Sequence, residues 1–188
     1  MSGYEIGGVA FGILSVWLIA RQRVLGWPTG IVNVSLFIVV FHQARLYADM
    51  GLQVVYVVLC AYGWYAWVRG GPGHGALVVR RASSILLAGL GVAGLGGAAL
   101  LGTVLHYHTD ASLPFVDAAT ASFSLVAQVL QARKYLENWV VWIVVDIVYV
   151  GMYLYKALFL TAGLYAVFLG LAVVGLRAWR RSVAVQGT

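Results

Sequence analysis

Apolar runs long enough to cross a lipid bilayer are the feature that most constrains this 188-residue chain. A hydrocarbon core of about 30 Å takes roughly 20 helical residues. Backbone polar groups in lipid must be paired within the chain, and the alternation typical of a membrane barrel is absent. We therefore predict an all-α membrane protein with seven transmembrane helices, at residues 4–20, 27–44, 50–68, 84–105, 111–132, 137–155 and 157–176.

Composition supports this fold class and excludes others. The chain is 62% hydrophobic and 10% charged, whereas soluble domains are about 25% charged. Its net charge of +6 does not indicate nucleic acid, because the basic residues separate apolar runs instead of clustering. The N-terminus lacks a basic region, so we expect a retained helix there rather than a cleaved signal. The single cysteine, Cys60, lies in an apolar run, and we expect it only to pack.

Lysine and arginine predict the orientation, because short cytoplasmic loops are enriched in them. With the N-terminus outside and the C-terminus in the cytoplasm, only Arg45 and Lys156 of the twelve basic residues fall outside. The predicted inner residues are Arg21, Arg23, Arg69, Arg80, Arg81, Arg133, Lys134, Arg177, Arg180 and Arg181.

The chain also matches itself at an offset of 112 residues. The informative matches are Arg21 with Arg133, Trp27 with Trp139, and Trp67 with Trp179. This offset passes over four spans, so both halves enter the membrane in the same direction, and we predict a 3+1+3 parallel repeat. Its parts are a first three-helix bundle at 4–68, a flexible cytoplasmic loop at 69–83, a linker helix at 84–105 and a second three-helix bundle at 111–176.

Polar residues are concentrated in the second half. Trp139, Trp142, Asp146, Tyr149, Tyr153 and Lys156 are spaced three or four residues apart, as are Asp117, Thr120, Ser124 and Gln128. The matching face in the first half carries Trp27, Gly30 and Asn33. A carboxylate near the bilayer centre costs at least about 2.5–3.5 kcal/mol, so Asp146 must face the bundle or a wet cavity. The linker helix has no polar side chain over residues 86–97 and cannot hold a substrate.

Several of these residues have simpler interpretations. Trp17, Trp64, Trp67, Trp179 and Trp139 fit an interfacial aromatic belt. Arg133 and Lys134 fit positive-inside anchors with Glu137 as their local partner, and Thr120 and Ser124 can bond back to the preceding helical turn. His106 and His108 beside Asp110 fit loop histidines better than a metal site. For Asp146, with Trp142 and Tyr149 one turn away on either side, a cation cage is the better interpretation.

Two motifs carry a family resemblance. They are Arg133-Lys134-x-x-Glu137-Asn138-Trp139-x-x-Trp142-x-x-x-Asp146, followed by Tyr149, Tyr153 and Lys156, and Gly26-Trp27-x-x-Gly30-x-x-Asn33. Over essentially the whole chain, the sequence resembles the PnuC family of bacterial vitamin transporters, best known for nicotinamide riboside. The resemblance implies a multi-pass inner-membrane protein that works by facilitated diffusion and supplies NAD biosynthesis. It further implies a cytoplasmic kinase that traps the substrate, and a homo-oligomer, commonly a trimer. We expect no amphipathic N-terminal segment of the kind seen in relatives.

The implied substrate fits the polar stripes. The pyridinium ring of nicotinamide riboside can stack on Trp142 or Tyr149 with Asp146 as counter-charge, and its ribose hydroxyls suit amide and hydroxyl side chains. The predicted substrate-binding residues are Asn33, Thr120, Ser124, Gln128, Asn138, Trp139, Trp142, Asp146, Tyr149 and Tyr153. We predict no catalytic residue, metal or cofactor, and no partner besides membrane lipid, the substrate, the kinase and further copies of the chain.

Other functions stay open or are disfavoured. Thiamine is also a flat cation with a hydroxyl tail, other ribosides or vitamins remain candidates, and a proton-coupled carrier could use Asp146. A receptor of the microbial rhodopsin type needs a lysine within the last helix, and residues 157–176 contain none. A membrane enzyme would have only Asp117 and Asp146 as an acid pair, and we expect these at different depths.

Overall fold

The described residues form seven α-helices and one short 3-10 helix. The computed structural model describes residues 3–43, 47–109 and 112–186. The helices are α1 Gly3–Ala20, α2 Gly26–Gln43, α3 Tyr47–Arg69, η1 Pro72–His74, α4 Ser84–His108, α5 Pro114–Ala132, α6 Asn138–Tyr155 and α7 Phe159–Gln186.

The prediction of an all-α membrane chain is confirmed in its main features. Among the described residues, α1, α3, α4, α5, α6 and α7 are long and apolar enough to cross a membrane. The 18-residue α2 is not in this group, and Thr29, Asn33 and Ser35 make it more polar. The predicted ranges agree with the helices except at some ends, where α7 continues ten residues past 176. The predicted ends at residues 44 and 111 lie outside the described residues.

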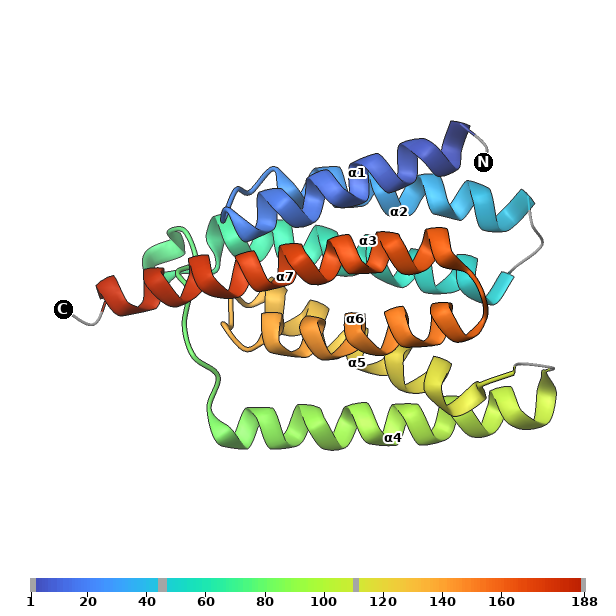
Figure 1. The fold of residues 1–188 in the computed structure, drawn as a ribbon. Helices are drawn as coiled ribbons and strands as arrows, with labels where there is room; N and C mark the ends of the chain where they lie inside the picture. Colours follow the sequence, from blue (N-terminus) through green and yellow to red (C-terminus); the bar gives the residue numbers. More distant parts are fainter. Residues whose placement is uncertain (1–2, 44–46, 110–111, 187–188) are drawn as a thin grey trace.

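Six helices form a closed ring, and the seventh lies outside it. Going round the ring, α1 packs on α2, α2 on α3, α3 on α5, α5 on α6, α6 on α7, and α7 back on α1. Helix α4 packs mainly against α5, at the edge of the bundle (Figure 1). Its glycines allow the close approach: a Cβ added at Gly94 would lie 2.9 Å from the ring of Phe123. The halves of the chain therefore meet at two contacts, α3 with α5 and α7 with α1.

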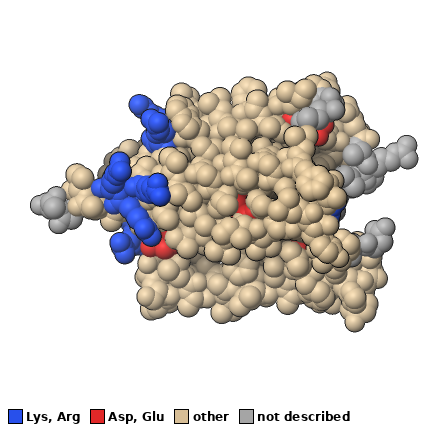
Figure 2. Space-filling view, in the orientation of Figure 1, with Lys and Arg blue, Asp and Glu red and all other residues tan. Residues whose placement is uncertain are grey.

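Basic side chains gather at one end of the bundle, on the left in Figure 2, where α1, α5 and α7 finish. The turn between α1 and α2, the turn between α5 and α6, and the last part of α7 supply most of them. Lys156 lies at the opposite end, in the turn between α6 and α7. Arg45 lies outside the described residues. The basic end is therefore distinct from the end at which α1 begins.

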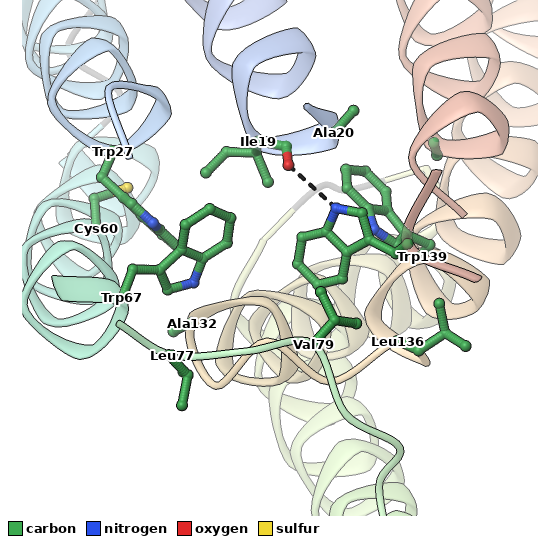
Figure 3. Packing of buried hydrophobic residues seen from close by; sticks show 12 residues of the cluster. Ile19, Ala20, Trp27, Cys60, Trp67, Leu77, Val79, Ala132, Leu136 and Trp139 are labelled. Atoms are coloured by element: carbon green, nitrogen blue, oxygen red, sulfur yellow. Dashed lines mark hydrogen bonds between the residues drawn. The ribbon is translucent and has the colours of Figure 1, made fainter. Parts of the chain in front are cut away.

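Four tryptophans form the centre of the hydrophobic core at this basic end (Figure 3). Trp27 packs edge-on to Trp67 with ring centroids 5.4 Å apart, and Trp139 packs edge-on to Trp179 at the same distance. Trp67 and Trp179 join the two pairs at 5.7 Å. All four side chains are at most 1% exposed.

The predicted aromatic belt is therefore wrong for three residues. Trp67, Trp139 and Trp179 are core residues, whereas Trp17 and Trp64 are 41% and 43% exposed, as belt residues would be. A tryptophan near the end of a span satisfies either environment, because its large apolar ring and single N–H suit both.

Hydrogen bonds from two of these tryptophans tie the halves together in a reciprocal way. Trp67 Nε1 on α3 donates to the carbonyl oxygen of Gln131 on α5 at 3.1 Å. Trp179 Nε1 on α7 donates to the carbonyl oxygen of Ile19 on α1 at 3.3 Å, drawn as the dashed line in Figure 3. The two donor tryptophans are 112 residues apart in the sequence, and so are the two acceptor residues. Each half thus places one indole on the last turn of the other half's first helix.

The turns that follow α1 and α5 also share one geometry. Gln22 and Lys134 both have a left-handed backbone, with φ of 56° and 54°. The next amide in each turn, of Arg23 and Tyr135, donates back five residues at 2.8 Å and 2.9 Å. Non-glycine residues adopt this conformation rarely, so its occurrence at both turns indicates that the tertiary packing around them requires it.

The loop from α3 to α4 is fixed in its second part, and the prediction of a flexible linker is wrong there. Leu77 and Val79 are buried in the tryptophan core. The backbone of Arg80 pairs with the turn between α5 and α6: its amide donates to the Lys134 carbonyl at 3.1 Å, and its carbonyl accepts from the Leu136 amide at 2.9 Å. This segment closes the basic end of the bundle.

Lys134 is not the surface anchor that the sequence suggested. Its side chain is 7% exposed, its Nζ donates to the Leu77 carbonyl at 2.8 Å, and Nζ lies 4.4 Å from the centroid of the Trp67 ring. Glu137, its predicted partner, instead accepts a hydrogen bond from the Ala82 amide at 2.9 Å. Lys134 therefore holds the loop on the tryptophan core.

The tight fit of Trp27 against Gly63 predicts a selective effect of adding one methyl group. A Cβ at Gly63 would overlap the Trp27 ring, which is itself fixed by Trp67. We expect Gly63→Ala to destabilise the protein by about 1–3 kcal/mol, measured by thermal unfolding in detergent. Gly51→Ala is the matched control on the same helix, because nothing lies within 4 Å of its added Cβ. Equal stability of both variants would contradict this packing.

Burial of Lys134 predicts a pH dependence of stability. Burial lowers the pKa of its ammonium group from 10.5 to about 8. Between these values the unfolded chain binds more protons than the folded one, so the free energy of unfolding rises with pH across that window. Relative to Lys134→Met, which cannot titrate, we expect the wild type to gain about 1–3 kcal/mol between pH 8 and pH 10.5. A stability difference that stays constant across this range would show that the ammonium is not desolvated.

Candidate functional site

A cavity of about 360 Å³ lies inside the ring of six helices. All six contribute to its lining, and α4 contributes no residue to it. Trp27 and Trp139 of the tryptophan core line it, so the core lies against the cavity on the side of the basic end. Its volume falls in the range of small-molecule sites, about 300–1,000 Å³.

Most of the predicted binding residues meet at this cavity. The eight that line it are Asn33, Ser124, Gln128, Trp139, Trp142, Asp146, Tyr149 and Tyr153. Thr120 and Asn138 do not line it. Thr120 Oγ1 donates to the carbonyls of Val116 and Asp117, and Asn138 Nδ2 donates to the Tyr135 carbonyl at 2.6 Å.

Asp146 is a buried acid without a partner. Its side chain is 4% exposed and borders the cavity. Within residues 3–43, 47–109 and 112–186, it makes neither a hydrogen bond nor an ion pair. Since a carboxylate in a membrane interior requires a compensating charge or donor, the cavity beside Asp146 is a place where a positive group would be stabilised.

The aromatic rings of α6 and α7 form one wall of the cavity. Tyr149 and Tyr153 stack with ring centroids 5.8 Å apart, and Tyr165 of α7 lies 4.5 Å and 5.2 Å from them. Phe168 meets Tyr165 edge-on at 5.8 Å. These rings present π faces and hydroxyl groups together, which suits a flat polar ring system.

Hydrogen bonds fix the amide side chains around the cavity. Trp142 Nε1 donates to Gln131 Oε1 at 2.8 Å, and Gln128 Nε2 donates to the Cys60 sulfur at 3.6 Å. Asn33 Nδ2 donates to the Gly8 carbonyl at 2.6 Å. Each amide therefore keeps a set orientation before any ligand arrives, and Cys60 borders the site as well as packing.

The hydroxyl groups on α5 are partly committed to their own helix. Ser124 Oγ donates to the Thr120 carbonyl at 2.7 Å, as the simpler interpretation of this stripe predicted. Ser124 still lines the cavity, whereas Thr120 does not.

Several lining residues were missed by the sequence analysis, although a signal was present for most. Gln131 continues the stripe on α5 that ends at Gln128. The other missed residues form two stripes on α3 and α7, whose sequences look uniformly apolar. Within each stripe the residues are again spaced three and four positions apart, which was the available signal. They are Gln53, Tyr56 and Cys60 on α3, and Tyr165, Phe168 and Ala172 on α7.

Most lining positions also occur as pairs 112 residues apart. The pairs are Gly12 and Ser124, Val16 and Gln128, Ile19 and Gln131, Trp27 and Trp139, Gly30 and Trp142, Val34 and Asp146, Phe41 and Tyr153, Gln53 and Tyr165, Tyr56 and Phe168, and Cys60 and Ala172. On α5 and α6 the second-half member is usually the polar one. The cavity therefore has a polar wall from α5 and α6 and a more apolar wall from α1 and α2.

The remaining candidate residues lie elsewhere. Asp117 forms an ion pair with Lys156, with a distance of 3.7 Å between Oδ2 and Nζ, and does not line the cavity. His106 packs its ring against Phe115 and Tyr107. Asp110 lies outside the described residues, and no group of three metal-ligating side chains occurs within them.

Comparison with known proteins gives a consistent result. Residues 2–181 match the family model described as nicotinamide mononucleotide transporter. The chain is 27% identical to the nicotinamide riboside transporter PnuC of Escherichia coli strain K12, over all of this chain and 89% of that protein. It is 26% identical to the riboflavin/roseoflavin transporter RibM of Streptomyces davaonensis, over 93% of this chain and 83% of that protein.

The fold also has a solved counterpart. The crystal structure of the vitamin B3 transporter PnuC superposes with a TM-score of 0.75, covering 96% of this chain and 82% of that one. The two sequences are 24% identical, so this likeness concerns the arrangement of the helices.

Proposed function

The chain belongs to the nicotinamide mononucleotide transporter family, and from this we propose that it is a multi-pass membrane transporter that carries nicotinamide riboside. The observation that carries the choice of substrate is Asp146, a buried acid that makes neither a hydrogen bond nor an ion pair with any described residue and borders a cavity walled by aromatic rings. The pyridinium ring supplies the missing positive charge and a flat surface for Trp142 or Tyr149. The ribose hydroxyls pair with Asn33, Gln128 and the hydroxyls of Ser124 and Tyr149, all of which line the cavity.

The charge of the cavity favours the riboside over two other ligands associated with relatives. Its described lining contains no lysine, arginine or histidine. A mononucleotide would bring a phosphate of charge about −1.5 to −2 into a site that already holds Asp146. A flavin ring carries no positive charge and would leave Asp146 uncompensated. Thiamine, in contrast, is a cation with a hydroxyl tail and remains the alternative substrate.

We propose the 3+1+3 parallel repeat as the architecture behind this site. The reciprocal tryptophan bonds, the matching turns and the paired lining positions all share the offset of 112 residues, which supports two equivalent three-helix bundles. Helix α4, packed outside the ring, is then the linker that lets both bundles enter in one direction. The basic end is proposed as the cytoplasmic side of a bacterial inner membrane, with the N-terminus outside (Figure 2).

The mode of transport is proposed to be facilitated diffusion. A cytoplasmic kinase would phosphorylate the riboside, and the mononucleotide would then be retained because the cavity opposes its phosphate. A homo-oligomer, commonly a trimer in the family, remains part of the proposal and rests on the resemblance alone. A proton-coupled carrier is the second candidate, favoured by Asp146, a buried acid that lines the cavity and could take up a proton in place of a cationic substrate.

Loss of the carboxylate charge should weaken riboside binding selectively. We expect Asp146→Asn, which keeps the side-chain shape, to raise the Kd for nicotinamide riboside by at least about tenfold, or 1.4 kcal/mol, in a titration of purified protein. His106→Ala, on α4 and away from the cavity, should bind like the wild type. Wild-type affinity in Asp146→Asn would remove this acid from the site. Tight binding of thiamine alone would overturn the choice of substrate.

Transport without a kinase should distinguish the two modes. In vesicles that contain only the purified protein, we expect nicotinamide riboside to equilibrate and not to accumulate. Dissipating the proton gradient should leave the initial rate unchanged. Uptake that collapses together with the gradient would exclude facilitated diffusion and support the proton-coupled carrier.

A further inference from the structure

A second, smaller cavity of about 210 Å³ lies at the basic end and shares no lining residue with the central one. It is formed by the end of α3, the loop that follows, and the turn after α5. Its lining includes Tyr62, Tyr65, Gly70, Leu77, Arg80 and Arg133. Two arginines and two tyrosines thus border one small pocket, here called the Arg80–Arg133 pocket.

Both arginines of this pocket are positioned by their surroundings. Arg133 Nε donates to the Tyr62 hydroxyl, and its Cζ lies 5.7 Å from the centroid of the Tyr62 ring. Arg80 Cζ lies 4.5 Å from the centroid of the Tyr135 ring, and the Arg80 backbone is paired with the turn after α5. Both arginines are exposed, but each guanidinium group packs against a tyrosine ring, which favours positions beside the pocket.

No carboxylate neutralises these two charges in the part of the chain that the structure describes. The ion pair between Lys156 and Asp117 lies at the far end of the bundle, and Glu137 bonds the Ala82 amide. Two like charges that border one pocket repel each other, and an anion bound between them would offset this repulsion. Arginine is well suited to such an anion when it is a phosphate, because the planar guanidinium can donate two parallel hydrogen bonds.

An exposed apolar track leads from this pocket along α3. Val55, Val58, Tyr62 and Tyr65 are spaced three and four residues apart and are 45%, 63%, 37% and 60% exposed. A free phosphate would use only the polar end of this surface. A phospholipid would use both parts, with its headgroup at the arginines and an acyl chain along the valines.

We propose that the Arg80–Arg133 pocket binds the phosphate of an anionic phospholipid headgroup. Arg80 and Arg133 hold the phosphate oxygens, and the Tyr65 hydroxyl donates to the headgroup. The bound lipid bridges α3, the loop after it and the turn after α5, which are the same elements that close the basic end of the bundle.

The proposal is tested with the purified full-length chain in a neutral detergent. Phosphatidylglycerol, phosphatidylcholine or inorganic phosphate is added, and binding is followed by native mass spectrometry and by the rise in Tm. We expect phosphatidylglycerol to bind and raise the Tm, with at least tenfold weaker binding in Arg80→Gln/Arg133→Gln. The matched control is Arg180→Gln/Arg181→Gln, which removes two exposed charges from the same end and should bind like the wild type.

Three results would overturn it. They are equal binding of phosphatidylcholine, an equal rise in Tm with inorganic phosphate alone, and unchanged phosphatidylglycerol binding in the double variant. If the double variant does not fold, the single exchange Arg80→Gln at an exposed side chain decides, with binding expected to weaken severalfold. Wild-type binding in that variant would likewise exclude the pocket.

Discussion

The rest of the structure depends on the two indole hydrogen bonds that cross between the halves of the chain. Trp67 reaches the end of α5 and Trp179 reaches the end of α1, so each bond closes one of the two contacts at which the halves meet. Helices in lipid gain little from hydrophobic burial against one another, because lipid tails are equally apolar. Hydrogen bonds and close ring packing therefore contribute much of the free energy of helix association, and both are concentrated at the basic end.

This concentration explains where the empty space lies. The four tryptophans, together with Leu77 and Val79 from the loop after α3, fill the ring of helices at the basic end. Further along the ring, small residues such as Gly12 and Gly30 line a cavity instead of a packed core. The same loop carries Arg80 to the turn after α5, so closure of the bundle and formation of the Arg80–Arg133 pocket follow from one set of backbone hydrogen bonds.

The sequence was sufficient for the helices and for most of the polar wall of the cavity. The lengths of the apolar runs predict the membrane-spanning helices. An acid such as Asp146 has few favourable positions in a membrane, so its place on the polar wall could also be predicted. It was not sufficient for Trp67, Trp179 and Lys134, because a ring or an amine near a span end suits the interface as well as the core. Only the position of the other half decides between these environments. Tyr56 and Tyr165 were missed for a related reason, since a tyrosine on an apolar helix shows no preferred face until its neighbours are known.

The pairing of lining positions also explains how two similar halves can form an asymmetric site. Shared positions such as Trp27 and Trp139 maintain the packing and are the same residue in both halves. At positions that only border the cavity, the halves differ: Val34 corresponds to Asp146, and Val16 to Gln128. A second acid in place of Val34 would put two carboxylates into one cavity whose described lining has no basic residue, and a single cation could not compensate both. One charged wall and one apolar wall therefore match a substrate that carries its positive charge on one flat ring.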